Sequence, residues 1–401
     1  MLHCSKLRIE TSVKNTILNK LLAAGGLTRH GKLAEATLAI QRALSSVTQA
    51  GTRSRAAWPM GGGGVTGDDR VVLDGLVRES EPERPANDVA SPGADVGRFL
   101  DSSFTGAAGI RAFKLFAPGG FSGETLPLVV MLHGCTQGPD DFAAGTRMNE
   151  LAQEEGFFVL YPAQAARSNT HKCWNWFSPG NQRRGAGEPA LLAGMVRHVL
   201  QTHPIDHDRV YVAGLSAGGA MTAILAREYP DVFAAAGVHS GLAAGAAHDV
   251  ASAFSAMKSG PAASAARPGA TRAANGPPVG TADGAAPRKS APVIVFHGDA
   301  DATVVAANGD AVITSALSGI AAVAEEVLDA CAVGTRRARR TVWRAADAGA
   351  DAPTLAEQWI VQGSSHAWSG GDSAGSYTDP QGPDASREML RFFLAHSRRA
   401  R

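Results

Sequence analysis

A serine that stands between a strand pattern and a helix pattern is the feature that most constrains this chain. Residues 210–213 form an apolar run, and Gly214-Leu215-Ser216-Ala217-Gly218 follows directly. Residues 219–226 then continue with apolar side chains at helical spacing. Strand, sharp turn and helix in immediate succession predict an α/β protein in which Ser216 stands on a strained turn.

The two glycines on either side of this serine have a steric purpose. A side chain at Gly214 or Gly218 would collide with the neighbouring strand and helix, so only glycine leaves the necessary room. The pattern G-x-S-x-G in this context is typical of the nucleophile elbow of α/β-hydrolases. We therefore predict that Ser216 is a catalytic nucleophile. A glycine-rich turn without a catalytic role is the alternative.

Short apolar segments alternate with amphipathic ones over residues 96–397, which we predict to be one catalytic domain. The segments with the character of strands are residues 112–117, 126–132, 157–161, 210–213, 234–239, 292–296 and 357–361. Those expected to be helices are residues 141–155, 190–202 and 384–396. The alternation predicts an α/β-hydrolase fold with a mostly parallel sheet covered by helices on both faces. In such sheets the chemistry lies at the carboxyl ends of the strands.

A serine hydroxyl needs a base to remove its proton, and the base needs an acid to orient it. Asp299 and Asp301 follow the penultimate predicted strand, and His366 follows the last one. The chain order Ser216, Asp301, His366 is the order expected of an α/β-hydrolase. We favour Asp301 as the acid because Asp299 is close enough to the strand end to serve as a turn-former. The histidines at the ends of two other strands are expected to be structural: His239 and His297.

The loop after the predicted strand at residues 126–132 reads His133-Gly134-Cys135-Thr136-Gln137. In lipases and esterases a loop at this place supplies one N–H of the oxyanion hole, and the residue after the nucleophile supplies the other. We therefore predict an oxyanion hole formed by the backbone N–H groups of Cys135 and Ala217. No histidine motif favours Cys135 over Ser216 as the nucleophile.

The block Cys173-Trp174-Asn175-Trp176-Phe177 is unusual in a chain with only 6% aromatic residues. Because it follows a predicted strand end, Trp174, Trp176 and Phe177 either form a wall of the substrate pocket or cap the core, and the residues alone favour neither. Cys173 would form a disulfide with Cys135 if its loop folds over the oxyanion turn. The four cysteines have no metal-like spacing, so no metal site is predicted.

Three segments differ from the catalytic domain in composition. Residues 1–45 include an amphipathic pattern over residues 32–44, which predicts a helical appendage that contacts the main domain or another protein, with a membrane-surface or targeting helix as the alternative. Residues 46–95 are rich in turn formers and charge and are expected to be a flexible linker. Residues from about 257 to 288 consist mostly of Ala, Gly, Ser, Pro and Thr and are expected to be a disordered insertion.

The charge and the apolar runs narrow the range of partners. Lys plus Arg total 38 against 37 for Asp plus Glu, so the balance of +1 offers no argument for binding nucleic acid. No apolar run approaches the length of a transmembrane helix. The basic residues near the start are not joined by a sustained apolar region, so no ordinary signal peptide is recognised.

Five blocks together resemble the poly(3-hydroxybutyrate) depolymerase-like esterases, which are related to feruloyl and acetylxylan esterases. These blocks are His133–Gln137, Cys173–Phe177, Gly214–Met221, His297–Val304 and Ser365–Gly371. The resemblance covers about residues 95–396 outside the insertion. It implies ester hydrolysis by Ser216, Asp301 and His366 without a metal or organic cofactor. It also implies an extracellular location, to which a cytoplasmic one is the alternative because no signal peptide is recognised.

The sequence therefore predicts a serine esterase that forms an acyl-enzyme, and the resemblance implies hydroxyalkanoate polyester or its oligomers as the substrate. Feruloyl or acetylxylan esters, or short-chain carboxylic esters in general, are the alternative substrates. A catalytically silent α/β-hydrolase fold used for binding is the alternative from another class, although all three triad members are present. A peptidase on this fold would usually carry a propeller or lid domain, and no repeat of propeller period is visible.

Overall fold

The computed structural model describes residues 96–121, 123–260, 290–320, 323–330, 336–345 and 354–400. The predicted N-terminal appendage, the linker and almost all of the predicted insertion lie outside these ranges, so what we expect of them stays a prediction. Within the described ranges, none of the helices has the length and apolar character needed to cross a bilayer.

A ten-stranded sheet in the order β1-β2-β4-β3-β5-β6-β7-β10-β9-β8 forms the centre of the described domain. Its strands are β1 (Arg98–Gly106), β2 (Gly109–Ala117), β3 (Leu126–Leu132), β4 (Phe158–Pro162), β5 (Ile205–Leu215), β6 (Ala235–His239), β7 (Val293–Gly298), β8 (Val323–Ala330), β9 (Ala338–Ala345) and β10 (Ala356–Val361). The strands from β4 to β10 in that order run parallel. The strands outside this block, at both edges, pair antiparallel. The mostly parallel sheet of the predicted α/β-hydrolase fold is therefore confirmed.

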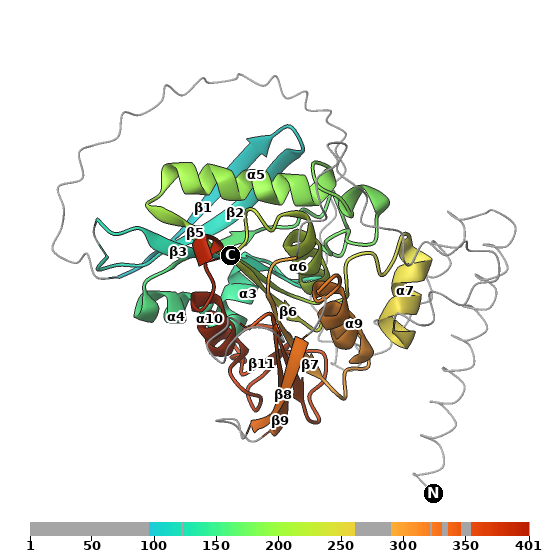
Figure 1. Ribbon diagram of the computed structural model, residues 1–401. Helices are drawn as coiled ribbons and strands as arrows, with labels where there is room; N and C mark the ends of the chain where they lie inside the picture. Colours follow the sequence, from blue (N-terminus) through green and yellow to red (C-terminus); the bar gives the residue numbers. More distant parts are fainter. Residues whose placement is uncertain are drawn as a thin grey trace, which may run out of the picture. The chain divides into compact units, whose positions relative to one another are not determined.

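Helices cover both faces of the sheet (Figure 1). They are α3 (Pro139–Thr146), α4 (Met148–Glu155), α5 (Gly187–Thr202), α6 (Ala217–Glu228), α7 (Val250–Ser259), α9 (Ala307–Ala316) and α10 (Ala385–Leu394). Alternate residues of β3 enter two separate cores. Leu128 and Val130 pack with side chains of α5 and α6, whereas Val129 and Met131 pack with those of α4 and α10. Because β3 is buried on both faces, it reads in the sequence as one continuous apolar run.

Two elements differ from the predictions. The helix expected over residues 141–155 is two helices, α3 and α4, separated by Arg147 in a left-handed conformation with φ of 53°. The segment around Gly375 packs against the end of α3, where a Cβ on Gly375 would lie 2.4 Å from the backbone N of Gly145. In addition, α7 extends to Ser259, so residues 257–259, which we assigned to the insertion, are helical.

Candidate active site

The turn between β5 and α6 is packed too closely for any residue but glycine at two positions. A Cβ on Gly218 would lie 2.0 Å from the carbonyl oxygen of Leu132, and one on Gly214 would lie 2.5 Å from the carbonyl carbon of Gly218. Between them Ser216 has φ of 58° and ψ of −117°, a strained combination for a residue with a side chain. This is the sharp turn that the glycine spacing predicts, and it leaves Ser216 partly exposed at the carboxyl end of β5.

The structure pairs His366 with Asp301 and not with Asp299. His366 Nδ1 lies 2.7 Å from Asp301 Oδ2, and the side chain of Asp301 is fully buried. The other carboxylate oxygen of Asp301 accepts hydrogen bonds from the N–H groups of Thr303, at 2.8 Å, and Val304, at 2.9 Å. Asp299 is exposed and accepts a hydrogen bond from the N–H of Gly363 at 2.7 Å, which is a turn contact.

The charge of Asp301 decides which nitrogen of His366 is basic. Burial alone would raise the pKa of Asp301, but the hydrogen bond and charge of His366, with the N–H of Val304, lower it below its ordinary value. An ionised carboxylate only accepts hydrogen bonds, so His366 Nδ1 carries a proton and donates a hydrogen bond to Asp301. In the neutral ring Nε2 is then left as the basic nitrogen.

Ser216, Asp301 and His366 follow β5, β7 and β10, whose carboxyl ends lie along one edge of the parallel sheet. His239, at the end of the intervening β6, connects two of these loops. Its carbonyl oxygen accepts a hydrogen bond from Ser216 N at 2.9 Å, and its Nε2 accepts one from Ser369 N at 2.9 Å. Burial lowers the pKa of His239 well below its ordinary value, so the ring is neutral and serves as an acceptor.

The loop after β3 lies directly beside the serine turn. A Cβ on Gly134 would come within 3.7 Å of Ser216 Cβ. Among the described residues, neither the N–H of Cys135 nor that of Ala217 donates to another protein group. Ala217 is the first residue of α6, where a backbone N–H has no acceptor within its own helix. The two N–H groups predicted to form an oxyanion hole are therefore both available to a ligand.

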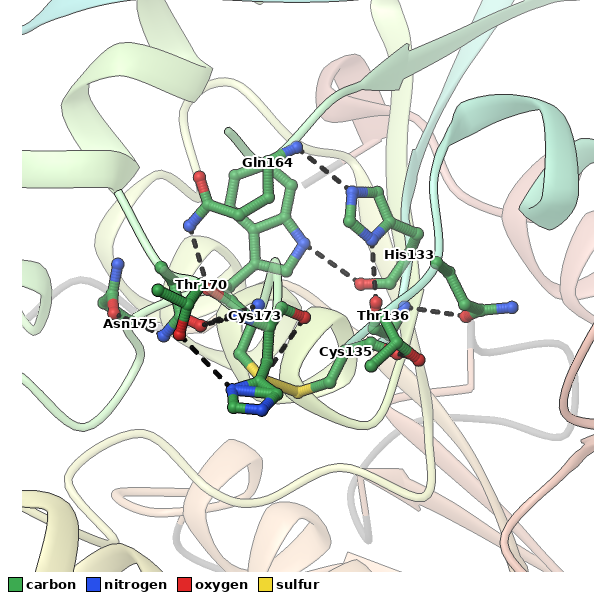
Figure 2. Close-up of a disulfide and its surroundings, with 12 residues drawn as sticks. His133, Cys135, Thr136, Gln164, Thr170, Cys173 and Asn175 are labelled. Carbon is green, nitrogen blue, oxygen red and sulfur yellow. Dashed lines mark hydrogen bonds between the residues drawn. A yellow bond between two sulfur atoms is a disulfide. The ribbon is translucent and has the colours of Figure 1, made fainter. Parts of the chain in front are cut away.

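A disulfide joins Cys135 to Cys173, with an S–S distance of 2.07 Å (Figure 2). Two hydrogen bonds accompany it: Thr136 N donates to the carbonyl oxygen of His171 at 2.6 Å, and Trp174 Nε1 donates to that of His133 at 3.0 Å. The turn that carries one candidate oxyanion donor is thus attached covalently to the aromatic loop.

The aromatic side chains of that loop are mostly core residues. Trp174 is fully buried and Trp176 is 4% exposed, and both pack in the core on the α5 and α6 side of the sheet. Phe177 is partly buried, and its ring meets that of Trp176 edge-on at 5.8 Å. For Trp174 and Trp176 this is the core-capping alternative, because neither offers an exposed wall to a substrate.

A buried polar network that sequence reasoning missed supports the aromatic loop. Gln164 Nε2 donates to the carbonyl oxygen of Cys173 at 2.9 Å, and Asn175 N donates to Glu188 Oε2 at 2.7 Å. The guanidinium of Arg111 lies 3.7 Å from Glu188 and also donates to Gln164. Burial lowers the pKa of Arg111, which nevertheless stays protonated in proteins. The partners come from β2, two loops and α5, so no local sequence pattern announces the network.

These groups supply the parts needed for acyl transfer: a hydroxyl on a strained turn, a base held by a buried acid, and two unused N–H donors. The described ranges contain no group of three or more His, Cys, Asp or Glu side chains that could hold a metal ion. Ser216 Oγ forms no hydrogen bond with any described residue. The structure therefore joins the candidate acid to the candidate base, and at the same edge of the sheet the Ser216 hydroxyl has no hydrogen-bond partner in the part of the chain that is described.

Comparison with known proteins finds a polyester depolymerase and a feruloyl esterase among the sequence relatives of this chain. The chain is 38% identical over 209 residues to the poly(3-hydroxyalkanoate) depolymerase C of Paucimonas lemoignei, covering 51% of this chain and 47% of that protein. It is 40% identical over 128 residues to the feruloyl esterase B of Thermothelomyces thermophilus, covering 32% and 43%. The chain thus spans less than half the length of these curated relatives.

An acetyl xylan esterase from Aspergillus awamori is similar in fold, with a TM-score of 0.51, 18% identity, and coverage of 75% of this chain and 100% of that one. The family model described as "Esterase PHB depolymerase" matches residues 111–344, from within β2 to within β9. The match includes Ser216, Asp301 and the loop after β3, and it covers more than half of the chain. The protein therefore belongs to the PHB depolymerase esterase family and has the α/β-hydrolase fold.

Proposed function

We propose that the protein is a serine esterase that hydrolyses carboxylic esters through an acyl-enzyme. The observation that carries this proposal is the 2.7 Å hydrogen bond between His366 Nδ1 and the buried carboxylate of Asp301, at the sheet edge where Ser216 stands on its strained turn. A base oriented in this way is what a serine hydroxyl requires to become a nucleophile. The family of the chain supports the same chemistry.

In the proposed reaction Ser216 Oγ attacks the ester carbonyl carbon while its proton moves to His366 Nε2. The negative charge that develops on the carbonyl oxygen is stabilised by the N–H groups of Cys135 and Ala217. His366 then gives the proton to the leaving alkoxide, and the alcohol departs. Water, deprotonated by His366, then attacks the acyl carbon, and His366 returns the proton to Ser216 Oγ as the acid is released. The hydroxyl and imidazole need not be hydrogen-bonded before the ester binds, because catalytic hydrogen bonds often tighten in the substrate complex.

The substrate we propose is a hydroxyalkanoate polyester or its oligomers. The support is the 38% identity to a poly(3-hydroxyalkanoate) depolymerase over half of this chain. Feruloyl esters are the second candidate, because a feruloyl esterase is 40% identical over a shorter region. An extracellular location fits both candidates. The Cys135–Cys173 disulfide supports it, since disulfides persist in oxidising compartments.

The first test is hydrolysis of p-nitrophenyl butyrate by the wild type and by Ser216→Ala, with circular dichroism to show that both are folded. We expect the variant to lose at least about a hundredfold in kcat, because the nucleophile is gone. Ser315→Ala, at the end of α9, is the matched control and should behave as the wild type. A Ser216→Ala variant as active as the wild type would exclude the serine mechanism, and a folded wild type without turnover would favour the binding-protein alternative.

The substrate is tested by comparing kcat/KM for 3-hydroxybutyrate dimer and trimer, ethyl ferulate and p-nitrophenyl acetate. We expect the highest value for the hydroxybutyrate trimer, and activity on amorphous polymer granules that is abolished in Ser216→Ala. A preference for ethyl ferulate over the trimer would overturn the polyester assignment while leaving the esterase chemistry intact.

A further inference from the structure

Gln137 lies two residues beyond the candidate oxyanion donor, and it is 2% exposed. Its Oε1 accepts a hydrogen bond from Gly134 N at 2.9 Å. Its Nε2 donates to Asp141 Oδ2 at 2.8 Å and to the carbonyl oxygen of Ser376 at 3.0 Å. A backbone N–H can only donate, and a carbonyl or ionised carboxylate can only accept. The amide of Gln137 therefore has one possible orientation.

The Asp141 carboxylate extends this contact to a segment far along the chain. Asp141 Oδ1 accepts from Ser376 N at 2.9 Å, and Oδ2 accepts from Ser376 Oγ at 2.6 Å. Burial raises the pKa of Asp141, but the bonds from Ser376 and Gln137 outweigh it and lower the pKa below its ordinary value. Asp141 is therefore an ionised acceptor that joins Gln137 to residues 372–379.

Residues 372–379 are in turn attached to the loop that carries the candidate base. Trp368 N donates to the carbonyl oxygen of Tyr377 at 2.7 Å, and Gly370 N donates to that of Asp379 at 2.9 Å. Residues 372–379 also contact the turn of residues 133–137 directly, because the hydroxyls of Tyr377 and Thr136 are 3.1 Å apart. Thr136 and Tyr377 both have positive φ, of 68° and 54°, a costly backbone that the surrounding contacts hold in place.

The hydrogen bonds of the turn determine which N–H groups are available to an ester. Gly134 N is occupied by Gln137 Oε1, and the carbonyl oxygen of Gly134 accepts from His133 Nδ1 at 2.8 Å. With both of these groups engaged, Cys135 N is the N–H of the turn left without an acceptor among the described residues. A side chain at position 137 that could not both accept and donate would leave Gly134 N without its acceptor, or would remove the donor to Asp141 and to the Ser376 carbonyl oxygen. Either loss would free the turn to rotate.

We propose that Gln137 is a positioning residue of the oxyanion hole. It occupies Gly134 N, directs Cys135 N toward the carbonyl oxygen of an ester on Ser216, and, through Asp141 and Ser376, attaches the turn to the His366 loop. The inference rests on the proposed serine esterase function. It assigns to one buried amide the alignment of two parts of the site that come from opposite ends of the catalytic domain.

The test is Gln137→Glu, which keeps the shape and the acceptor for Gly134 N but sets a carboxylate against Asp141 and the Ser376 carbonyl. We expect kcat for p-nitrophenyl butyrate to fall about ten- to a hundredfold, less than the loss of a whole oxyanion donor, with KM within about threefold of the wild type. The Ki of butylboronic acid, which forms a tetrahedral adduct with a nucleophilic serine, should rise by a similar factor.

Gln153→Glu is the matched control. The amide of Gln153 also accepts from a backbone N–H, that of Gly119 at 3.0 Å, and donates to the carbonyl oxygen of the same residue at 3.2 Å. It lies at the end of α4, away from the carboxyl ends of the strands, and we expect the kcat and Ki of Gln153→Glu to be those of the wild type.

The double variant Gln137→Glu/Asp141→Asn returns a hydrogen-bond donor to this pair of residues, because the new amide at 141 faces the new carboxylate at 137. It should recover part of the lost kcat.

Ser376→Ala provides a second route if Gln137→Glu does not fold, because Ser376 is exposed and its substitution removes only a hydroxyl. We expect a fall of about fivefold in kcat without a change in KM, because the hydroxyl loses its hydrogen bonds with Asp141 and Gln137 while the backbone hydrogen bonds of Ser376 remain. Folded Gln137→Glu with the kcat and Ki of the wild type would overturn the inference alone. A loss of kcat in Gln137→Glu no greater than that in Gln153→Glu would overturn it as well. A wild type whose turnover does not depend on Ser216 would overturn the proposed function and the inference together.

Discussion

Acid should destabilise this protein through His133, and the size of the effect follows from the structure. The imidazole is 1% exposed. Its Nε2 accepts a hydrogen bond from Gln164 N at 3.1 Å, so the proton of the neutral ring is on Nδ1, which donates to the carbonyl oxygen of Gly134. Burial lowers the pKa of His133 from 6.5 to about 4, although the bond to Gly134 acts in the opposite direction.

The sign follows from which state binds the proton. Between pH 6.5 and about 4 an unfolded chain has His133 protonated while the folded chain keeps it neutral. Protons then favour unfolding, so this contribution to stability is complete above pH 6.5 and is lost as the pH falls toward 4. The full difference amounts to about 3 kcal/mol of unfolding free energy, and about 2 kcal/mol of it is lost by pH 5.

The assay is urea unfolding at pH 7.5 and pH 5, followed by tryptophan fluorescence, for the wild type and His133→Gln. The glutamine cannot titrate, and its oxygen can still accept from Gln164 N. We expect the variant to lose about 2 kcal/mol less than the wild type between the two pH values. His239 and His297 also have pKa values lowered by burial, but they contribute equally to both proteins.

His207→Gln is the control for this experiment, because His207 is exposed. It should leave the pH dependence of the wild type unchanged. If wild type and His133→Gln lose the same free energy on acidification, the buried neutral His133 is not the source of the acid sensitivity, and the reasoning from burial is refuted.

Three further predictions concern the site. Asp301→Asn should lower kcat by about 10⁴, since His366, the proposed base, would take the wrong tautomer, whereas Asp299→Asn should stay within about threefold of the wild-type kcat. Replacing both cysteines of the disulfide, Cys135→Ala/Cys173→Ala, should lower the unfolding free energy in urea by about 2–4 kcal/mol and lower kcat as the oxyanion turn loosens. Gly218→Ala should yield little folded protein, as judged by circular dichroism, because its Cβ would overlap a backbone oxygen at 2.0 Å.

Each of these three predictions has an outcome that would contradict it. Equal losses in Asp301→Asn and Asp299→Asn would remove the reason for choosing between the carboxylates. Unchanged kcat in the double cysteine variant would show that hydrogen bonds alone hold the oxyanion turn. A Gly218→Ala protein with the melting temperature of the wild type would mean that the turn can open without cost.

The parallel strands could be predicted because burial on both faces produces continuous apolar runs. The prediction for residues 126–132 coincides with β3, and that for residues 234–239 differs from β6 by one residue. The mostly exposed edge strand β1 has no such run and was not predicted. The break between α3 and α4 was also missed, and the segment around Gly375 that packs against the end of α3 lies more than two hundred positions away in the sequence.

The candidate site divides in the same way. Ser216, Asp301 and His366 are recognisable because each lies in a short motif directly after a strand. The side-chain amide of Gln137 joins Gly134 to Ser376, which lies 239 positions after Gln137. No spacing in the sequence predicts that contact. For the aromatic block the sequence left two interpretations open. Composition drew attention to Trp174 and Trp176, but only the fold reveals that they are buried.

The order of the strands has a consequence for how the protein is made. The serine turn follows β5, while the imidazole proposed to activate it follows β10, the last strand of this sheet along the chain. During synthesis the elbow leaves the ribosome well before its base, so a nascent chain has a nucleophile with nothing to deprotonate it. Under the proposed function, hydrolytic capacity begins only after β10 has docked beside β7.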